Sequence, residues 1–247
     1  MTREELVLQE AAIAAEQSGN IDVAYDAWRT LTSIDANRPD YFCKLGRVAE
    51  RLGRWAYAEQ AFLDAIKVAS NLKAIPSTPE SPELVDKTLS LAKTLLGSLF
   101  LKRTDGDRLA NARKAKEWLE QAVAVDPNQA SLSYLGSALA RLGEKVAAKA
   151  AYRKVIELDE TYVEAYINLG HLLSADGQAI EAEGLFRKAV QLDPCSHRAH
   201  GALGVLLEEL GNYSEAEAEL KRTLELNPND PIARNRLRLL ADEMNQE

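Results

Sequence analysis

Three side chains near residue 200 are of types that can bind a metal ion. Cys195, His197 and His200 lie within six residues of one another, and zinc takes sulfur and nitrogen ligands of these kinds. A structural zinc site needs about four ligands in tetrahedral geometry. No Cys-x-x-Cys or His-Glu-x-x-His motif accompanies the three residues. We therefore predict no metal site and interpret His200 as a packing residue.

A short acidic segment, Asp105-Gly106-Asp107, is the second candidate for metal chemistry. It is too short for a calcium loop, which needs ligands spread over about twelve residues. The sequence also has no Gly-rich phosphate-binding loop and no nucleophile elbow. It therefore predicts no catalytic residues, no cofactor and no enzyme activity.

The overall charge is acidic, because 30 Lys and Arg stand against 38 Asp and Glu, for a formal net charge of −8. Nucleic-acid binding needs a basic face, so we expect no nucleic-acid partner. No stretch approaches the roughly 18 apolar residues of a membrane span, so we expect no membrane partner either. Two distant cysteines and the absence of an apolar signal segment favour a cytoplasmic location.

A block of sequence recurs at a fixed interval, and it must define the elements that carry these side chains. Gly136, Gly170 and Gly204 are each 34 residues apart, and Ala148, Ala182 and Ala216 keep the same step. This period is typical of tandem helix–turn–helix units. The sequence therefore predicts an array in which each unit packs on its neighbours.

The clearest unit predicts two helices with small residues where they meet. The first helix contains Gly170 and ends near Gly177, because glycine takes the left-handed conformation at a helix C-terminus without strain. The second helix contains Ala182 and Phe186 and stops before Pro194. Gly170 and Ala182 should let the two helices approach closely, while Phe186 fills the space between them.

These positions resemble those of the tetratricopeptide repeat family. The family's small residue in the first helix, alanine in the second helix and terminal proline match Gly170, Ala182 and Pro194. The next unit matches in the same way, whereas Glu160 replaces the proline in the unit before. The resemblance implies an all-α fold, a right-handed superhelical α-solenoid of antiparallel helix pairs with a C-terminal capping helix.

We expect six such pairs, organised in five parts. These are two N-terminal repeats over 1–72, a Pro-rich insertion loop over 73–83, an irregular third repeat over 84–128 with an extended helix and a six-residue insertion in its loop, three regular repeats over 129–230 and a capping helix over 231–247. The loop over 73–83 is interpreted as a surface connection, and a partner-docking loop is the alternative.

In this family the first helices line the concave face, so the resemblance implies which side chains face a partner. The side chains expected to line the concave face are Gln9, Ile13, Asp40, Cys43, Lys44, Arg47, Arg51, Thr94, Leu95, Ser98, Ser133, Tyr134, Ser137, Arg141, Ile167, Asn168, His171, Arg198, Gly201, Ala202 and Val205. The expected partner-binding residues among them are Lys44, Arg47, Arg51, Ser133, Tyr134, Ser137, Ile167, Asn168, His171, Arg198 and Val205. The mixture suits an extended peptide or a partner helix, with Asn168 bonding to backbone amides. Lys44, Arg47 and Arg51 share one helix face, which we interpret as a solvated charged face, and contact with an acidic peptide is the alternative.

The function expected from the repeat is that of a scaffold or adaptor, which holds a peptide or protein segment in the concave groove. Two alternatives stay open: a self-assembling structural module, which would make the chain a homo-oligomer, and a recruiting or regulatory subunit of a multi-protein enzyme.

Overall fold

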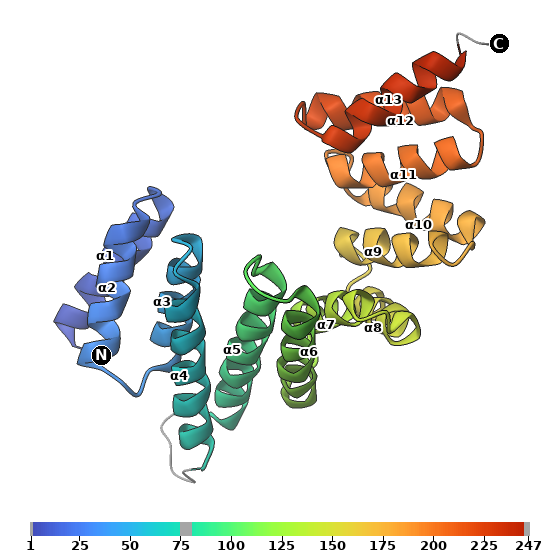
Figure 1. Ribbon diagram of the computed structural model, residues 1–247. Helices are drawn as coiled ribbons and strands as arrows, with labels where there is room; N and C mark the ends of the chain where they lie inside the picture. The colour runs from blue at the N-terminus through green and yellow to red at the C-terminus, as the bar shows by residue number, and fades with distance from the viewer. Residues whose placement is uncertain (1, 75–80, 245–247) are drawn as a thin grey trace. The chain divides into compact units, whose positions relative to one another are not determined.

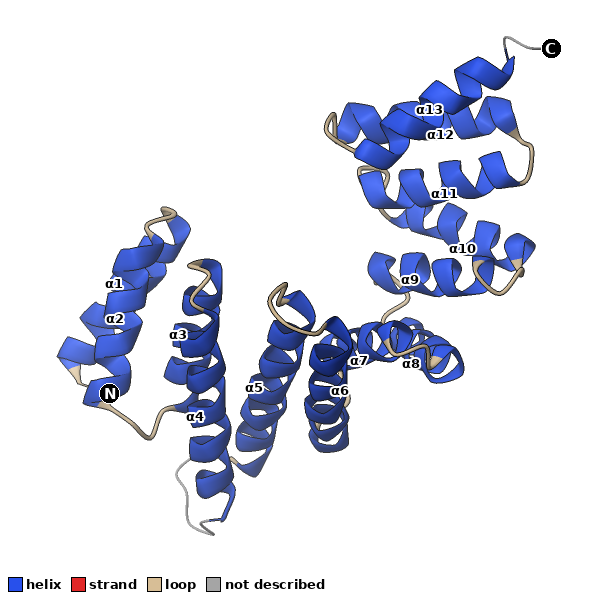
Figure 2. Cartoon of the chain, in the orientation of Figure 1, coloured by secondary structure: helices blue, strands red, loops and turns tan. Residues whose placement is uncertain are grey.

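In the computed structural model, which describes residues 2–74 and 81–244, every regular element is an α-helix (Figure 2). The side chains of residues 242–244 lie outside the description. The helices are α1 Arg3–Gln17, α2 Ile21–Ile34, α3 Pro39–Arg51, α4 Trp55–Ala74, α5 Pro82–Lys102, α6 Arg108–Val125, α7 Gln129–Arg141, α8 Lys145–Leu158, α9 Val163–Ser174, α10 Ala179–Leu192, α11 His197–Glu209, α12 Tyr213–Leu226 and α13 Pro231–Met244 (Figure 1). The predicted all-α solenoid of helix pairs is confirmed.

Local sequence signals set the helix ends. Thr2 caps α1, and its side chain and that of Glu5 satisfy each other's backbone N–H groups. Gly177, at φ 77°, lies in the turn that follows α9, where a side chain would be strained. The turn predicted at this glycine is therefore confirmed.

Glycines in the first helix of a pair allow the second helix to pack closely. A Cβ atom on Gly46 would lie 2.4 Å from the Phe62 ring, and one on Gly170 would lie 2.5 Å from the Phe186 ring. Both rings are buried, at 0% and 1% exposed. The small residue and the large one therefore fit together in both places, as the repeat pattern predicts.

The chain forms two compact units, residues 1–143 and 144–247. Within each unit every helix packs on its neighbour in sequence. Odd-numbered helices also pack on one another, as in α3 with α5, α5 with α7, α9 with α11 and α11 with α13, whereas no two even-numbered helices of the described chain do so. Helices α3, α5 and α7 in the first unit and α9, α11 and α13 in the second thus form an inner layer, as the resemblance implies for the first helix of each pair.

The region around the Pro-rich segment differs from the boundaries expected for it. Lys73 and Ala74 belong to α4, and α5 begins at Pro82, with Ser81 accepting a hydrogen bond from the Leu84 amide. Proline fits the first helical position because no helix bond needs its missing N–H. The described ends of the expected loop over 73–83 are therefore helical, and residues 75–80 lie outside the described residues.

Helix α13 covers the end of the second unit. Ala233 and Leu240 are each 1% exposed, and Leu237 is half-buried, whereas Arg234 and Arg238 face solvent. The helix packs on α12 and α11. One buried face and one polar face are what a terminal cap requires.

Candidate functional site

The inner layer of the second unit contains a pocket of about 350 Å³. We call it the C-terminal pocket, and it is lined by His171, His197, Arg198, Gly201, Ala202, Val205, Leu220, Asp230, Ile232, Ala233 and Arg236. These residues come from α9, α11, α12, α13 and the turn before α13 (Figure 1). The volume falls in the range of ordinary ligand sites.

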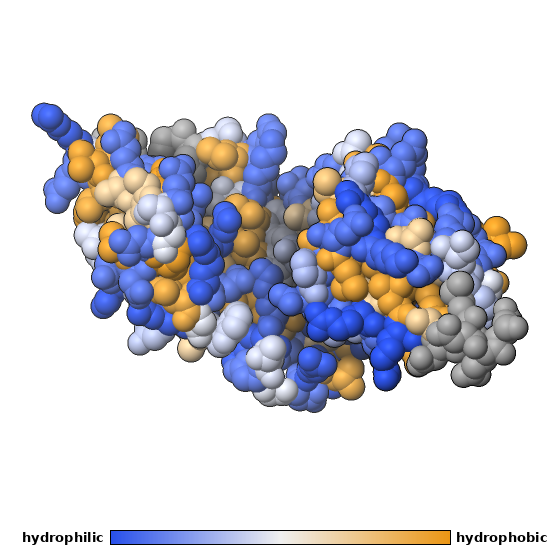
Figure 3. Space-filling model, turned by 90° about the horizontal axis from the view of Figure 1, so that it is seen from above, coloured by the Kyte–Doolittle hydropathy of each residue, from blue (hydrophilic) through white to orange (hydrophobic). Residues whose placement is uncertain are grey.

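The floor of the C-terminal pocket is apolar. Leu220 is fully buried, and Ala202 and Ala233 are 7% and 1% exposed. Val205 is half-buried, while Ile232 remains 61% exposed at the edge. Hydrophobic side chains also reach the surface elsewhere, in patches between hydrophilic ones (Figure 3). A guest side chain in this pocket would remove apolar surface from water on both partners.

Charged groups flank the apolar floor. Arg198 forms an ion pair with Glu164, and Arg236 Nη1 lies 3.2 Å from Glu208 Oε1. Both pairs are partly exposed, so their arginines keep further N–H donors for a guest. Arginine donors arranged in this way suit carboxylate acceptors.

Two histidines, His171 and His197, add polar ring nitrogens to the pocket. His171 sets its ring against Phe186, with centroids 5.1 Å apart. His171 stays exposed to solvent on one side, but desolvation by the surrounding protein, reinforced by the nearby Arg198 charge, lowers its pKa below the usual value. Nδ1 of His197 is shielded from solvent and, within the described residues, has no hydrogen-bond partner, since Asp230 is 3.9 Å away. Such an atom gains from a polar partner supplied by a ligand.

The residues expected at a partner-binding face in this unit divide into two groups. His171, Arg198, Gly201, Ala202 and Val205 all line the C-terminal pocket. Asn168 is half-buried and does not line it.

Ile167 corrects the expectation, because it is fully buried and presents no surface to a partner. Consecutive helical side chains point about 100° apart. A face read from sequence is therefore least accurate at its edges.

Sequence reasoning missed the contribution of α13 to the pocket. Ile232 and Arg236 line it, and they lie 34 residues after Arg198 and Ala202. The repeat phase therefore continues into the capping helix, which places these two residues at inner-face positions. That phase was the signal available in the sequence.

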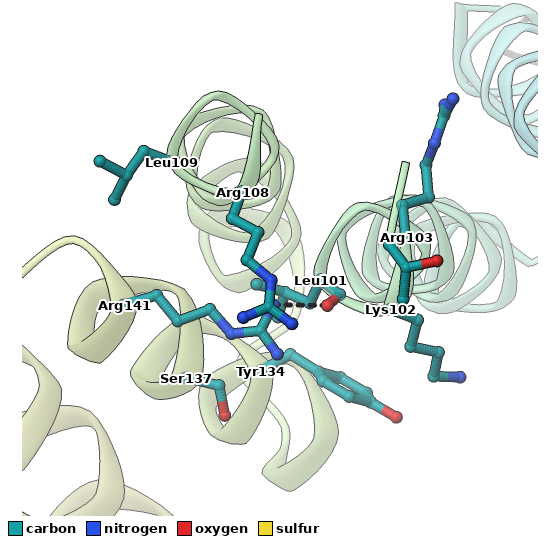
Figure 4. Close-up of a pocket in the computed structure, with 9 residues that line it drawn as sticks. Leu101, Lys102, Arg103, Arg108, Leu109, Tyr134, Ser137 and Arg141 are labelled. Atoms are coloured by element: carbon teal, nitrogen blue, oxygen red, sulfur yellow. Dashed lines mark hydrogen bonds between the residues drawn. The ribbon is translucent and has the colours of Figure 1, made fainter. Parts of the chain in front are cut away.

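The first unit holds a larger pocket, of about 690 Å³ (Figure 4). We call it the basic pocket, and it is lined by Leu101, Lys102, Arg103, Thr104, Arg108, Leu109, Tyr134, Ser137 and Arg141. Three residues expected at a partner-binding face therefore lie here, namely Tyr134, Ser137 and Arg141.

The remaining expected residues of this unit are placed elsewhere. Ser133 is 8% exposed, and its carbonyl accepts a bond from Ser137 Oγ, so Ser133 is a poor contact residue. Lys44, Arg47 and Arg51 line neither of these two pockets, and Arg47 and Arg51 are exposed.

The next residues to locate are His200 and Cys195, which the sequence offered as metal ligands. His200 is 7% exposed, and its ring nitrogens lie 2.6 Å from Glu219 Oε2 and 3.1 Å from the Pro194 carbonyl oxygen. Cys195 is exposed. His200 thus packs inward, as its place in the repeat predicts, with both nitrogens engaged.

The acidic segment and the second cysteine are likewise accounted for. Asp105 pairs with Arg103, and Asp107 caps α6 by accepting a bond from the Leu109 amide. Burial raises the pKa of Cys43 to about 12, so this thiol stays protonated and unreactive. Among the described residues, no three or more His, Cys, Asp or Glu side chains gather at one point suited to a metal.

Membrane insertion has no candidate element in the described part of the chain. No helix there combines the length and the apolar character that crossing a bilayer requires.

Comparison with known protein families identifies repeats in the C-terminal half of the chain. Tetratricopeptide repeat family models match residues 134–162, 151–184 and 173–241. No curated protein matches the chain in sequence.

Solved structures extend the likeness to nearly the whole fold. PilW, a type IV pilus biogenesis factor, is 14% identical with a TM-score of 0.74, over 96% of this chain and 100% of PilW. A chain of the APC/C hetero-tetramer Cut9–Hcn1 is 15% identical with a TM-score of 0.76, over 96% of this chain and 42% of that one. YrrB, a TPR protein with an unusual peptide-binding site, is 18% identical with a TM-score of 0.57, over 86% of this chain and 98% of YrrB. At these identities the likeness concerns the fold.

The helix pairs, the glycine–aromatic packing and the family matches agree, and the chain is a tetratricopeptide repeat protein.

Proposed function

We propose that this protein is an adaptor that holds a segment of a partner protein in the C-terminal pocket. One observation carries the proposal: an apolar floor and two arginines, contributed by helices α11, α12 and α13, lie around one cavity. A floor that excludes water and a rim that donates hydrogen bonds are the features of a recognition site.

The chemistry of the lining defines the guest. A volume of about 350 Å³ suits one or two apolar side chains and the adjoining backbone. Arg198 and Arg236 are paired with Glu164 and Glu208, and the N–H donors that these pairs leave over favour acidic residues beside that apolar anchor. Asn168, on the same helix as His171, is proposed to bond the backbone of the guest where it leaves the pocket.

Two structural relatives are consistent with such a role. YrrB is described as carrying a peptide-binding site, and Cut9 was solved in complex with Hcn1. Proteins of this repeat family mediate protein and peptide binding. We extend that role to this chain because of the pocket lining. If the chain is a subunit of a multi-protein enzyme, we propose that it recruits a partner and takes no part in the chemistry.

Display of random peptides against the immobilised full-length protein tests the proposal. Selected peptides should share an apolar residue next to one or more acidic residues. Ile232→Asp places a carboxylate at the pocket edge and should weaken these peptides about tenfold, since it adds repulsion and removes apolar contact. Binding is measured by fluorescence anisotropy of labelled peptides.

The control variant is Ile180→Asp. Ile180 is 88% exposed on α10 and, like Ile232, is the second residue of its helix. An aspartate at either position suits the positive end of the helix, so neither variant should lose its fold. If peptides bind Ile232→Asp and Ile180→Asp equally well, the C-terminal pocket is not the site. Light scattering over a concentration series separates this adaptor from a self-assembling module, which would grow in mass.

A further inference from the structure

The basic pocket of the first unit collects positive charge in an acidic protein. Lys102, Arg103, Arg108 and Arg141 all line it, and no carboxylate of the described residues does. The whole chain, by contrast, carries a formal net charge of −8. A cavity of one sign concentrates ligands of the opposite sign.

Two of the four cations are already neutralised by the fold. Arg103 donates to Glu59 at 2.8 Å and to Asp105 at 2.8 and 3.0 Å. Lys102 Nζ lies 2.7 Å from Glu50 Oε1. These pairs fix the wall of the pocket and leave little free charge on Lys102 and Arg103.

The other two arginines retain free donors. Within the described residues the side chain of Arg108 has no hydrogen bond or ion pair, and the residue is exposed. Arg141 uses one N–H group on the Leu101 carbonyl, near the C-terminus of α5, and has further donors. Both guanidinium groups point toward the centre of the pocket and toward each other (Figure 4). Like charges so placed repel unless an anion lies between them.

The position of Arg108 argues that it is not there to stabilise its helix. It is the first residue of α6, where the unpaired N–H groups make the helix end positive. A cation at that place slightly destabilises the helix, and no contact of the Arg108 side chain within the described residues compensates for this. The residue stands at the end of the six-residue insertion that distinguishes the third repeat.

Apolar and hydroxyl groups complete the pocket. Leu109 is 49% exposed, and the half-buried Tyr134 ring forms part of the wall. A guest can therefore place carbon atoms on Leu109 and Tyr134 while its anion meets the two arginines. The volume of about 690 Å³ exceeds what a single phosphate ion needs.

We propose that the basic pocket binds a phosphorylated serine or threonine of a peptide segment, through Arg108 and Arg141. A phosphate group carries close to two negative charges and three acceptor oxygens, which match two guanidinium groups better than one carboxylate does. This site lies in a different unit from the C-terminal pocket and does not depend on the function proposed for it.

The test uses the full-length protein and blocked tripeptides, titrated by NMR. Acetyl-Leu-phosphoserine-Leu-amide should shift the side-chain signals of Arg108 and Arg141, and it should bind at least about tenfold more tightly than the serine tripeptide. Arg108→Gln should weaken it about tenfold, and so should added salt, because the pocket is open to solvent. The fold is not at risk, since the substitution removes an unfavourable charge.

Arg113→Gln is the matched control, because Arg113 is exposed on the same helix and does not line the pocket. It should leave binding unchanged within about twofold, and so should Ile232→Asp, so that the two proposals fail separately. Equal weakening by Arg108→Gln and Arg113→Gln would overturn the site. Inorganic phosphate binding as tightly as the phosphopeptide would reduce it to a free-anion site, and an equally tight Leu-Glu-Leu tripeptide would refute the preference for phosphate.

Discussion

Glycine has two opposite effects inside these helices, and the neighbouring atoms decide which one applies. Gly170 lies against the Phe186 ring, so a Cβ atom has no room. Gly184, in α10, has no atom within 4 Å of the place where a Cβ would stand. Gly170 is therefore needed for close helix packing, whereas Gly184 only weakens its helix.

Substituting alanine for each glycine should therefore give changes of opposite sign. Gly170→Ala forces the helices apart and should lower the free energy of unfolding by about 1–3 kcal/mol. Gly184→Ala should raise it by about 1 kcal/mol, because alanine favours helix over glycine. Urea denaturation of both variants measures the difference. A stable Gly170→Ala variant would mean that the Phe186 ring can move aside.

His171 should make stability depend on pH. Its folded-state pKa lies below the usual value of 6.5, chiefly because the surrounding protein desolvates a ring that is still partly open to solvent. Below that pH the unfolded chain binds a proton more readily than the folded chain, so stability is full above about pH 6.5 and is lost as the pH falls.

His171→Gln should remove that part of the loss. The measurement is the free energy of unfolding at pH 7.5 and at pH 5.5 for the two proteins, and the wild type should show the larger decrease. Parallel decreases would mean that the ring protonates freely in the folded state.

At the scale of elements, the capping helix both stabilises the second unit and supplies one wall of its pocket. Leu240 is 1% exposed and Leu239 is 39% exposed, so adjacent leucines face opposite environments. Ile232, Ala233 and Arg236 on the same helix line the C-terminal pocket. Loss of α13 packing should therefore remove stability and binding together.

Leu240→Ala should lower the free energy of unfolding by about 2–3 kcal/mol, because it leaves a cavity under α13. Leu239→Ala should cost less than about 1 kcal/mol. Thermal unfolding compares the two, and peptide binding should decrease for Leu240→Ala alone. Equal costs would show that α13 is not docked through this face.

At the scale of the molecule, stability should be local. Within each unit the described helices contact their near neighbours, and repeat arrays transmit stability between adjacent repeats. Phe62 and Phe186 occupy equivalent places in the two units. They therefore offer a matched pair of core sites.

Phe186→Ala should cost about 3–5 kcal/mol in its own unit, since it empties a buried aromatic site. Hydrogen exchange followed by mass spectrometry should accelerate in α8 to α11 and stay unchanged in α1 to α4. Phe62→Ala should give the reverse pattern. Exchange that rises along the whole chain in either variant would indicate a single cooperative unit.

The sequence by itself determined the helix pairs, the position of their turns and the identity of their packing residues. The 34-residue step, Gly177 and the match of Gly170 with Phe186 are local features, which backbone conformation and helix periodicity fix within about one repeat. His171, Arg198 and Val205 line one pocket because their phase follows the same period, and their contact with a partner stays a prediction.

Only the tertiary structure decided which of those residues share a cavity. Ile167 is buried although its neighbour Asn168 is half-exposed, because one residue turns the side chain by about 100° around the helix. The meeting of Arg108 with Arg141, and of Arg198 with Arg236, depends on how three helices stack. The two residues of each pair line one pocket although they are more than 30 positions apart, and packing rather than local preference sets the distance between them.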